Sequence, residues 1–448
     1  MSKSCVSFVH DLTFGDLPAV VVSRAKLYLL DLIGVAASGR QTRLSQIAHG
    51  FAVRQLGCMS GGARLLFDDR TASPAGAAYA GAATIDSFDA HDGHALTKGH
   101  AGVALLPALL AVADSGARVE GHNFLTSLVM GYEVATRAGI ALHASVPDYH
   151  TSGAWNSLGC AAIVARLLGL SAEATRHALG IAEYHGPRSQ MMRAIDHPTM
   201  VKDGSAWGAL AGVSAGYLAA DGFTGAPAVT VEATAEEPIW HDLGQRWRIL
   251  EQYVKPQPVC RWAQPAVEAA SKLRKQHDIH PENIARVRVE TFGAAVRLGN
   301  RVPRTTEEAQ YAIGFPVAAL LVNGQIGAEE ISEAGLRSPQ IAGLCQKVEL
   351  QESAAFTARF PAERIAIVTI EQTDGMERTS DPTTARGDPD NPLPESEIVG
   401  KFRKLTQALS DTRRAEIERA IAALPQNDSQ PLRDAVLAPL RGNATGRR

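Results

Sequence analysis

The sequence has 448 residues, of which 45% are hydrophobic and 20% charged, and its formal net charge is −3 at pH 7. These values are ordinary for a globular protein, and the length suggests two or three domains. The slightly negative charge excludes a global basic field for nucleic acid or an anionic membrane. We therefore expect a small molecule or another protein as the partner, with no nucleic acid and no membrane.

Five cysteines are scattered along the chain without a CxxC pair. This pattern predicts reduced thiols in a cytoplasmic protein. The first 18 residues lack the apolar core of a signal peptide. The sequence has no uninterrupted run of about 20 apolar residues, so we expect no membrane span.

The first 265 residues predict helices. The segment 17–38 repeats apolar residues at three- and four-residue spacing and begins beside Pro18, which is tolerated at a first helical turn. The segments 102–116, 123–143, 156–182 and 205–223 are rich in alanine and glycine and are apolar nearly all round, as buried helices are.

Strands join the helices after about residue 265. In ARVRVETF (285–292), Val287 and Val289 alternate with arginines, which predicts a half-buried strand. In RIAIVTIEQTDGMERTS (364–380), Asp374-Gly375 predicts a hairpin turn between two strands. Helical patterns at 266–277 and 311–324 interleave with these strands, and the Pro/Asp-rich connector 380–397 precedes helical patterns at 396–410 and 411–424.

This order predicts a mainly α protein with an α+β part. A large all-helical domain is formed by the N- and C-terminal segments, residues 1–265 and 395–448. The smaller α+β domain, residues 266–394, is inserted between them.

The segment HDGHALTKGHAG (91–102) is the first candidate site. His91, His94 and His100, with Asp89 just before them, supply ligand types suited to zinc or iron. The same histidines could transfer protons near neutral pH, with a carboxylate fixing the tautomer and Lys98 binding a substrate carboxylate. A polar loop without chemistry is the third interpretation, and this segment alone leaves all three open.

Other polar segments lie at predicted helix starts. In PDYHTSGAWNSLGCAA (147–162), Thr151 or Ser152 could cap a helix whose amide end favours an anion. Lys202 in TMVKDGSAWGALAG (199–212) could attract a carboxylate, and Arg261, close to Gln264, offers a planar fork that matches one. Together they suggest a site for a polyanionic small molecule.

These segments, in this order, resemble the MmgE/PrpD family over most of the chain. The similarity rests on AKLYLLDLIGVAASG, DAHDGHALTKGHAGVALLPALLA, YHTSGAWNSLGCAAIVARLLGL, MVKDGSAWGALAGVSAGYLAADGFTG, KPQPVCRWAQPAVEA and GDPDNPLPESEIVGKF. The resemblance implies the two-domain architecture above, a homodimer, and catalysis on a small di- or tricarboxylate without cofactor or metal. It implies proton removal next to a carboxylate, followed by loss of water, loss of carbon dioxide or epimerisation.

By position, the resemblance makes Asp89, His100, His150 and Lys202 the catalytic residues. We expect six further residues to bind substrate: His91, His94, Lys98, Thr151, Arg261 and Gln264. One histidine would move the proton while Lys202 and Arg261 hold carboxylates and stabilise enolate-like charge.

The sequence also departs from the family pattern. The departures are His91 for a usual aspartate, Gly93 for a hydroxyl residue, Ala101 for a proline, Gln264 for a histidine and Phe315 for a tyrosine. We expect a hydro-lyase resembling 2-methylcitrate dehydratase, with an iminodisuccinate epimerase-like or cis-aconitate decarboxylase-like reaction as the alternative. A metal-dependent hydrolase is a more remote one.

Overall fold

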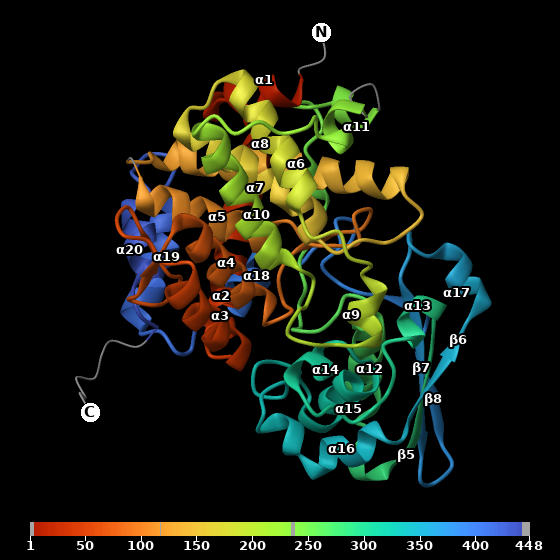
Figure 1. Cartoon of the computed structure of the whole chain (residues 1–448). Helices are drawn as coiled ribbons and strands as arrows, with labels where there is room; N and C mark the ends of the chain where they lie inside the picture. The colour runs from red at the N-terminus through yellow and green to blue at the C-terminus, as the bar shows by residue number, and fades with distance from the viewer. Residues whose placement is uncertain (1–3, 117, 234–237, 441–448) are drawn as a thin grey trace.

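The structure, a computed structural model, describes residues 4–116, 118–233 and 238–440. A bundle of helices forms the larger part, and a five-stranded sheet with helices against it forms the smaller part (Figure 1). The predicted fold class, mainly α with a smaller α+β part, is confirmed. No helix of the described ranges is both long and apolar enough to span a bilayer.

Eleven α-helices and two short pairs of strands occupy the described residues up to 253. The helices are α1 (Cys5–Asp11), α2 (Ala19–Gly39), α3 (Arg43–Gln55), α4 (Pro74–Asp86), α5 (Gly102–Ser115), α6 (Gly121–Ser145), α7 (Gly153–Leu168), α8 (Ala172–His185), α9 (Met192–Asp196), α10 (Ser205–Ala220) and α11 (Pro238–His241). The strands are β1 (Ala63–Arg64), β2 (Thr71–Ala72), β3 (Gly93–His94) and β4 (Gln252–Tyr253).

These helices follow the apolar patterns of the sequence. α2 starts directly after Pro18, and α5 is buried on nearly every side, including Pro107 within it. The apolar stretch 156–182 forms two helices, because Gly169 adopts a left-handed conformation with φ 64° and ends α7. Small residues let α4, α5, α7 and α10 pack closely around the core.

The α+β part is built on one sheet with the strand order β6-β5-β7-β8, and β9 also pairs with β7. The strands are β5 (Ile284–Thr291), β6 (Val348–Glu352), β7 (Ile365–Gln372), β8 (Glu377–Thr379) and β9 (Thr383–Thr384). The helices are α12 (Gln264–His277), α13 (Gly293–Val296), α14 (Thr306–Gln310), α15 (Gly314–Asn323), α16 (Pro339–Cys345) and α17 (Ala354–Arg359).

Two strand predictions are confirmed. Val287 and Val289 are buried in β5 and alternate with Arg286 and Arg288, which are only partly buried. β7 and β8 form an antiparallel hairpin around Asp374-Gly375, and Gly375 has φ 85°, which glycine adopts without strain. β5 pairs in parallel with β6 and antiparallel with β7.

The C-terminal helices pack against the N-terminal ones. They are α18 (Glu395–Leu405), α19 (Asp411–Ala423) and α20 (Gln430–Leu437). α18 lies along α2, where Lys401 forms a buried ion pair of 2.7 Å with Asp31 and donates to the carbonyl oxygen of Ala90 at 2.6 Å. α18 therefore supports the backbone just before His91.

Candidate active site

A pairing between distant segments builds the site. β3 and β4 run antiparallel with Gly93 opposite Tyr253, which places the segment 89–100 against residues 252–255. Close approach requires the glycine, because a Cβ at position 93 would lie 2.5 Å from the Tyr253 hydroxyl and 2.7 Å from Nδ1 of His100. The Tyr253 hydroxyl and the His100 ring are therefore neighbours.

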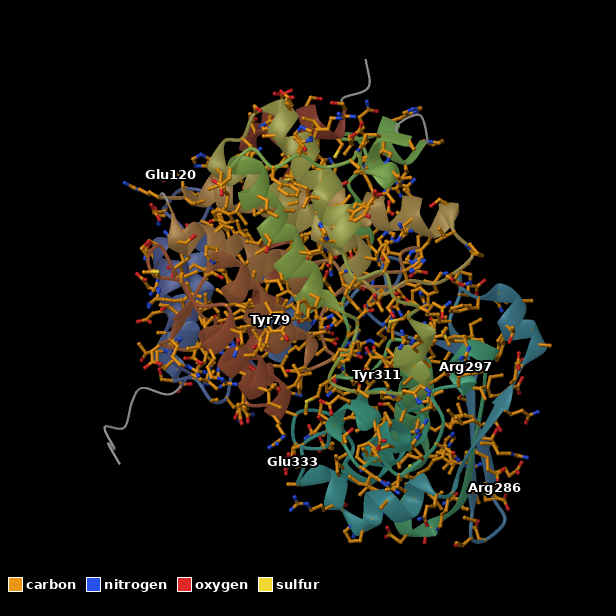
Figure 2. All side chains as sticks on the ribbon, in the orientation of Figure 1. Tyr79, Glu120, Arg286, Arg297, Tyr311 and Glu333 are labelled. Carbon is orange, nitrogen blue, oxygen red and sulfur yellow. The ribbon has the colours of Figure 1, made fainter. Side chains whose placement is uncertain are left out.

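These segments surround a cavity of about 20 Å³. Its polar lining consists of Asp89, Lys98, His100, Tyr149, Tyr253, Lys255, Arg261, Tyr311 and Arg364. Tyr311 follows α14 and Arg364 precedes β7, so both parts of the molecule contribute. Figure 2 shows Tyr311 where the helical bundle meets the α+β part.

Asp89 lies at one end of this cavity in a cluster of buried charges. Its Oδ1 is 2.7 Å from Nζ of Lys255, and the side chain of Gln310 accepts from the Asp89 amide at 3.1 Å and from Lys202 at 2.7 Å. Burial alone would raise the pKa of Asp89, but Lys255 and Lys202 hold it below its ordinary value. Asp89 is therefore a carboxylate at neutral pH.

His100 is held in a defined tautomer. Its Nδ1 lies 2.6 Å from the carbonyl oxygen of Asp92, which can only accept, so Nδ1 carries the proton and Nε2 has the free lone pair. Burial, with the nearby Lys255 and His91, lowers the pKa of His100 well below 6.5. The ring is therefore neutral at physiological pH and able to accept a proton.

The Ser152 hydroxyl supports this histidine from behind. It accepts the His100 backbone amide at 2.8 Å and forms a short hydrogen bond with Asp203. Burial and the nearby Asp86 raise the pKa of Asp203 to about 8, so this carboxyl holds a proton at neutral pH. The expected helix-capping role is wrong for both candidates, since Ser152 makes these contacts instead and the Thr151 hydroxyl donates to the carbonyl of Pro187.

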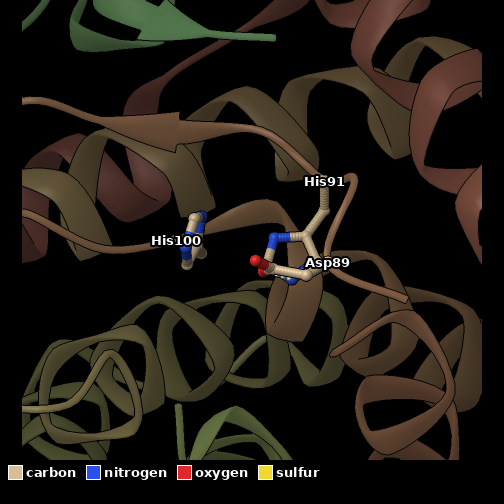
Figure 3. A group of neighbouring side chains, drawn as sticks. All are labelled: Asp89, His91 and His100. Carbon is tan, nitrogen blue, oxygen red and sulfur yellow. Dashed lines mark ion pairs between the residues drawn. The ribbon is translucent and has the colours of Figure 1, made fainter. Parts of the chain in front are cut away.

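Asp89, His91 and His100 are the only group of metal-ligand type found in the described ranges, with one ligand atom of each within 4.8 Å of the others. Figure 3 shows His91 beside Asp89, with His100 facing them. Nε2 of His91 lies 3.4 Å from Asp86 and 3.7 Å from Asp89. The Lys255 ammonium, already bonded to Asp89, repels a cation there, so the cluster fits acid–base chemistry better than metal binding.

Both Lys98 and Lys202 have positive φ values of 51°. A left-handed backbone costs free energy in a lysine, and such strain is concentrated at functional sites. Lys98 lies over the ring of Tyr149 at 5.0 Å and Lys202 over the ring of Tyr311 at 4.5 Å. The strained backbone thus places two cations at the site.

Arg261 and Gln264 hold the opposite wall together. Arg261 pairs with Asp388 at 2.6 Å, donates to Gln264 at 3.2 Å and lies over the Tyr253 ring at 4.6 Å. Gln264 is buried and donates to the carbonyls of Gln257 and Val259, outside the cavity lining. Arg261 therefore already forms an ion pair with an acid of the chain.

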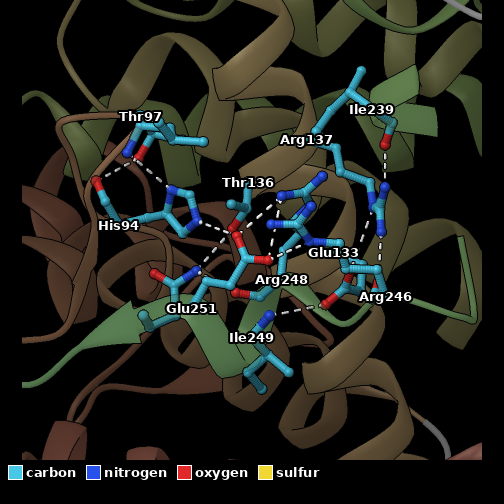
Figure 4. A network of polar contacts seen from close by, with 12 residues as sticks. His94, Thr97, Glu133, Thr136, Arg137, Ile239, Arg246, Arg248, Ile249 and Glu251 are labelled. Atoms are coloured by element: carbon cyan, nitrogen blue, oxygen red, sulfur yellow. Dashed lines mark hydrogen bonds and ion pairs between the residues drawn. The ribbon is translucent and has the colours of Figure 1, made fainter. Parts of the chain in front are cut away.

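His94 belongs to a network of charged side chains (Figure 4). Its Nε2 is 3.2 Å from Glu251, which also pairs with Arg248 at 3.0 Å, and Arg137 bonds Glu133. Burial lowers the pKa of His94, although Glu251 opposes that change. The network fastens the β3–β4 pair to α6.

His150 lies beside the cavity and does not line it. Its backbone amide donates to Nε2 of His143 at 3.1 Å, and the two rings stack 6.4 Å apart. Its neighbour Tyr149 lines the cavity and donates to the carbonyl of Lys98. Of the ten residues expected from the sequence, the cavity lining contains Asp89, His100, Lys98 and Arg261, while Lys202 reaches it through Gln310 and Tyr311.

Five polar lining residues were not among those expected from the sequence: Tyr149, Tyr253, Lys255, Tyr311 and Arg364. Tyr253 and Lys255 lie at the start of the segment YVKPQPVC. An aromatic and a charged residue just before a proline-rich turn could have indicated a binding site. Tyr311 and Arg364 carry no local signal, because only the packing of the α+β part brings them to His100.

The sequence of this chain matches both domains of one family along most of its length, and the chain belongs to the MmgE/PrpD family. The MmgE/PrpD N-terminal domain matches residues 3–235, and the MmgE/PrpD C-terminal domain matches residues 258–426.

Curated relatives are similar along nearly their whole length. The cis-aconitate decarboxylase-like protein oryM of Aspergillus oryzae is 27% identical over 93% of both chains. The cis-aconitate decarboxylase of Aspergillus terreus is 24% identical over 97% of this chain and 95% of its own. The human cis-aconitate decarboxylase is 26% identical over 90% of this chain and 87% of its own. Two of these relatives are named as cis-aconitate decarboxylases, and the third is named as a protein like one.

Proposed function

We propose that this protein is a lyase that acts on a small polycarboxylate at the cavity around His100. One observation carries the proposal: four cations, Lys98, Lys255, Arg261 and Arg364, line the same small cavity as a neutral histidine. Cations favour a substrate with several carboxylates and stabilise the negative charge that develops beside one of them. The coarse class agrees with the relatives, whose names are those of decarboxylases.

Decarboxylation is the branch that we favour, because the curated relatives share it by name. The bond between a carbon and its carboxylate breaks, carbon dioxide leaves, and the electron pair stays on the carbon as an enolate-like anion. The cations stabilise that anion, and a proton donor then quenches it. Loss of water, expected first from the sequence, and epimerisation form the same kind of anion by proton removal.

The proton roles follow from the geometry. Nε2 of His100 carries the free lone pair and is the proposed base in the two branches that remove a proton, dehydration and epimerisation, whereas decarboxylation needs a proton donor only. Tyr253 is the proposed donor, since burial raises the pKa of its phenol and the hydroxyl keeps its proton at neutral pH. Lys202 and Lys255 hold a substrate carboxylate near Asp89. His150, beside the cavity, is the alternative base.

Nuclear magnetic resonance in deuterated water tests the proposal. Chelator-treated protein is mixed with cis-aconitate, 2-methylcitrate, citrate or iminodisuccinate. We expect deuterium on a carbon next to a carboxylate, with carbon dioxide released from cis-aconitate and no dependence on added metal. A dehydrated or epimerised product would select another branch, and the absence of exchange in all four would refute the proposal.

Two matched variants then assign the base. His100→Ala should lower turnover by about 10²- to 10⁴-fold if His100 moves the proton. His150→Ala should change it much less. The reverse order would transfer the role to His150, and Lys202→Ala tests the carboxylate clamp by raising KM.

The homodimer implied by the resemblance stays a prediction. α10 exposes the apolar side chains of Trp207 and Leu218, which a second copy could cover. Sedimentation of the purified protein would show a mass of about twice that of one chain if the prediction is correct.

A further inference from the structure

We propose that Lys98 and Arg364 form a separate carboxylate subsite in the cavity, which selects substrates with a carboxylate beyond the one that Lys255 holds. The inference deepens the proposed function and depends on it. It gives Arg364 and Lys98 a specific role in binding, and it predicts that the protein distinguishes substrates by the presence of a further carboxylate.

Arg364 is a buried cation without an acid. Arg364 is 6% exposed and directly precedes β7. Its Nη2 donates to the carbonyl oxygen of Ala95 at 3.2 Å. Nε is buried and bonds to nothing in the described chain. Within those described ranges no carboxylate lies within ion-pair distance of this guanidinium. A buried arginine is costly unless an anion completes its hydrogen bonds.

Lys98 reaches the same turn from the helical part. Its amide donates to the same Ala95 carbonyl at 3.3 Å, and its ammonium lies over the Tyr149 ring. Burial and the nearby Arg364 lower the pKa of Lys98. The Arg364 guanidinium and the Lys98 backbone amide therefore meet at one carbonyl, and both side chains line one cavity. An anion shared by the two cations would stabilise both.

The other lining cations differ in this respect. Lys255 pairs with Asp89 at 2.7 Å and Arg261 pairs with Asp388 at 2.6 Å. Among the four cations that line the cavity, Lys98 and Arg364 are therefore the two without a carboxylate partner in the described ranges. Lys255 and Arg261 are therefore partly neutralised by acids of the chain, whereas Lys98 and Arg364 are available for a further carboxylate of the ligand.

Binding without turnover tests the subsite. The probes are tricarballylate and methylsuccinate, which share one carbon skeleton except that methylsuccinate lacks a terminal carboxylate. Titration calorimetry of the full chain should show tricarballylate binding more tightly. In Arg364→Gln the affinity for tricarballylate should fall about 10- to 100-fold, the loss expected of a charge-assisted contact, while methylsuccinate binding changes less than about threefold.

Lys98→Gln is the second variant and should reproduce this selective loss. Arg288→Gln is the matched control, because Arg288 is a half-buried residue of β5 that pairs with Glu377 and does not line the cavity. Equal weakening of both probes, or none, in a folded Arg364→Gln and Lys98→Gln would overturn the subsite and leave the proposed function standing. Failure of the wild-type protein to bind either probe would overturn both.

Discussion

Replacing Lys255 by methionine should test the electrostatics of the cavity most directly. Lys255 is fully buried, and its ammonium lies 2.7 Å from Asp89 and 3.2 Å from the Asp89 carbonyl. Methionine keeps most of the volume but removes the charge. Asp89 then stays buried with Lys202 as the remaining cation near it, at the far side of Gln310.

Loss of one partner of a buried ion pair costs about 3–5 kcal/mol, because the other charge is left without compensation. For a chain of this length, with an unfolding entropy of about 2.1 cal/mol/K per residue, that cost corresponds to a melting temperature roughly 3–5 °C lower. The pH dependence of this loss in stability follows from Asp89, whose pKa in the folded protein lies below its unfolded value of about 3.9. In the wild type, the ionised Asp89 stabilises the folded protein above that pH, and this stabilisation is lost as the pH falls below it. In the variant, protonation of Asp89 at low pH removes the cost of the uncompensated buried charge.

The gap in melting temperature between wild type and Lys255→Met should therefore be largest near pH 7 and shrink towards pH 4. Calorimetry over pH 4–8 measures it. Lys272→Met, at an exposed position of α12, is the matched control and should change the melting temperature by less than about 1 °C. A Lys255→Met gap below about 1 °C, or one that does not change with pH, would refute the reasoning.

Two further variants test the proton and the support behind His100. Tyr253→Phe should lower turnover by about 10²- to 10⁴-fold while methylsuccinate binding is kept, and wild-type turnover would exclude the phenol as donor. Tyr79→Phe is the control, because Tyr79 is a half-buried residue of α4 that does not line the cavity. Asp203→Asn should raise the melting temperature, because Asp203 has a pKa of about 8 in the folded protein and ionised aspartate weakens the fold as pH rises from about 4 to 8. The gain should grow across that range and level off above it, and a gain that is constant with pH would contradict the raised pKa.

The sequence alone predicted the elements that local chemistry determines. The Asp374-Gly375 hairpin, the start of α2 after Pro18 and the buried apolar helices all follow from turn residues and periodicity. Helix ends were less predictable, since Gly169 divides a stretch whose apolar pattern continues.

The site was only partly predictable, because its assembly depends on pairing between distant residues. Nothing local in Gly93 indicates that Tyr253 will lie opposite it. Lys98 and His100 were chosen for their residue type, but the tautomer of His100 depends on the Asp92 carbonyl, and the partner of Asp89 proved to be Lys255. Arg364 was out of reach, since it comes from the sheet of the other part.

The size of the cavity has a kinetic consequence. A volume of about 20 Å³ accommodates little more than one water molecule, whereas a tricarboxylate is many times larger. For a ligand of that size to reach His100, we expect Tyr311 and Arg364, on the α+β part, to move away from Asp89 and Tyr149, on the helical part. Each turnover would then include an opening and a closing of the two parts. A turnover rate that falls as solvent viscosity rises would show that this motion limits the rate, and a rate independent of viscosity would assign the limit to the chemical step.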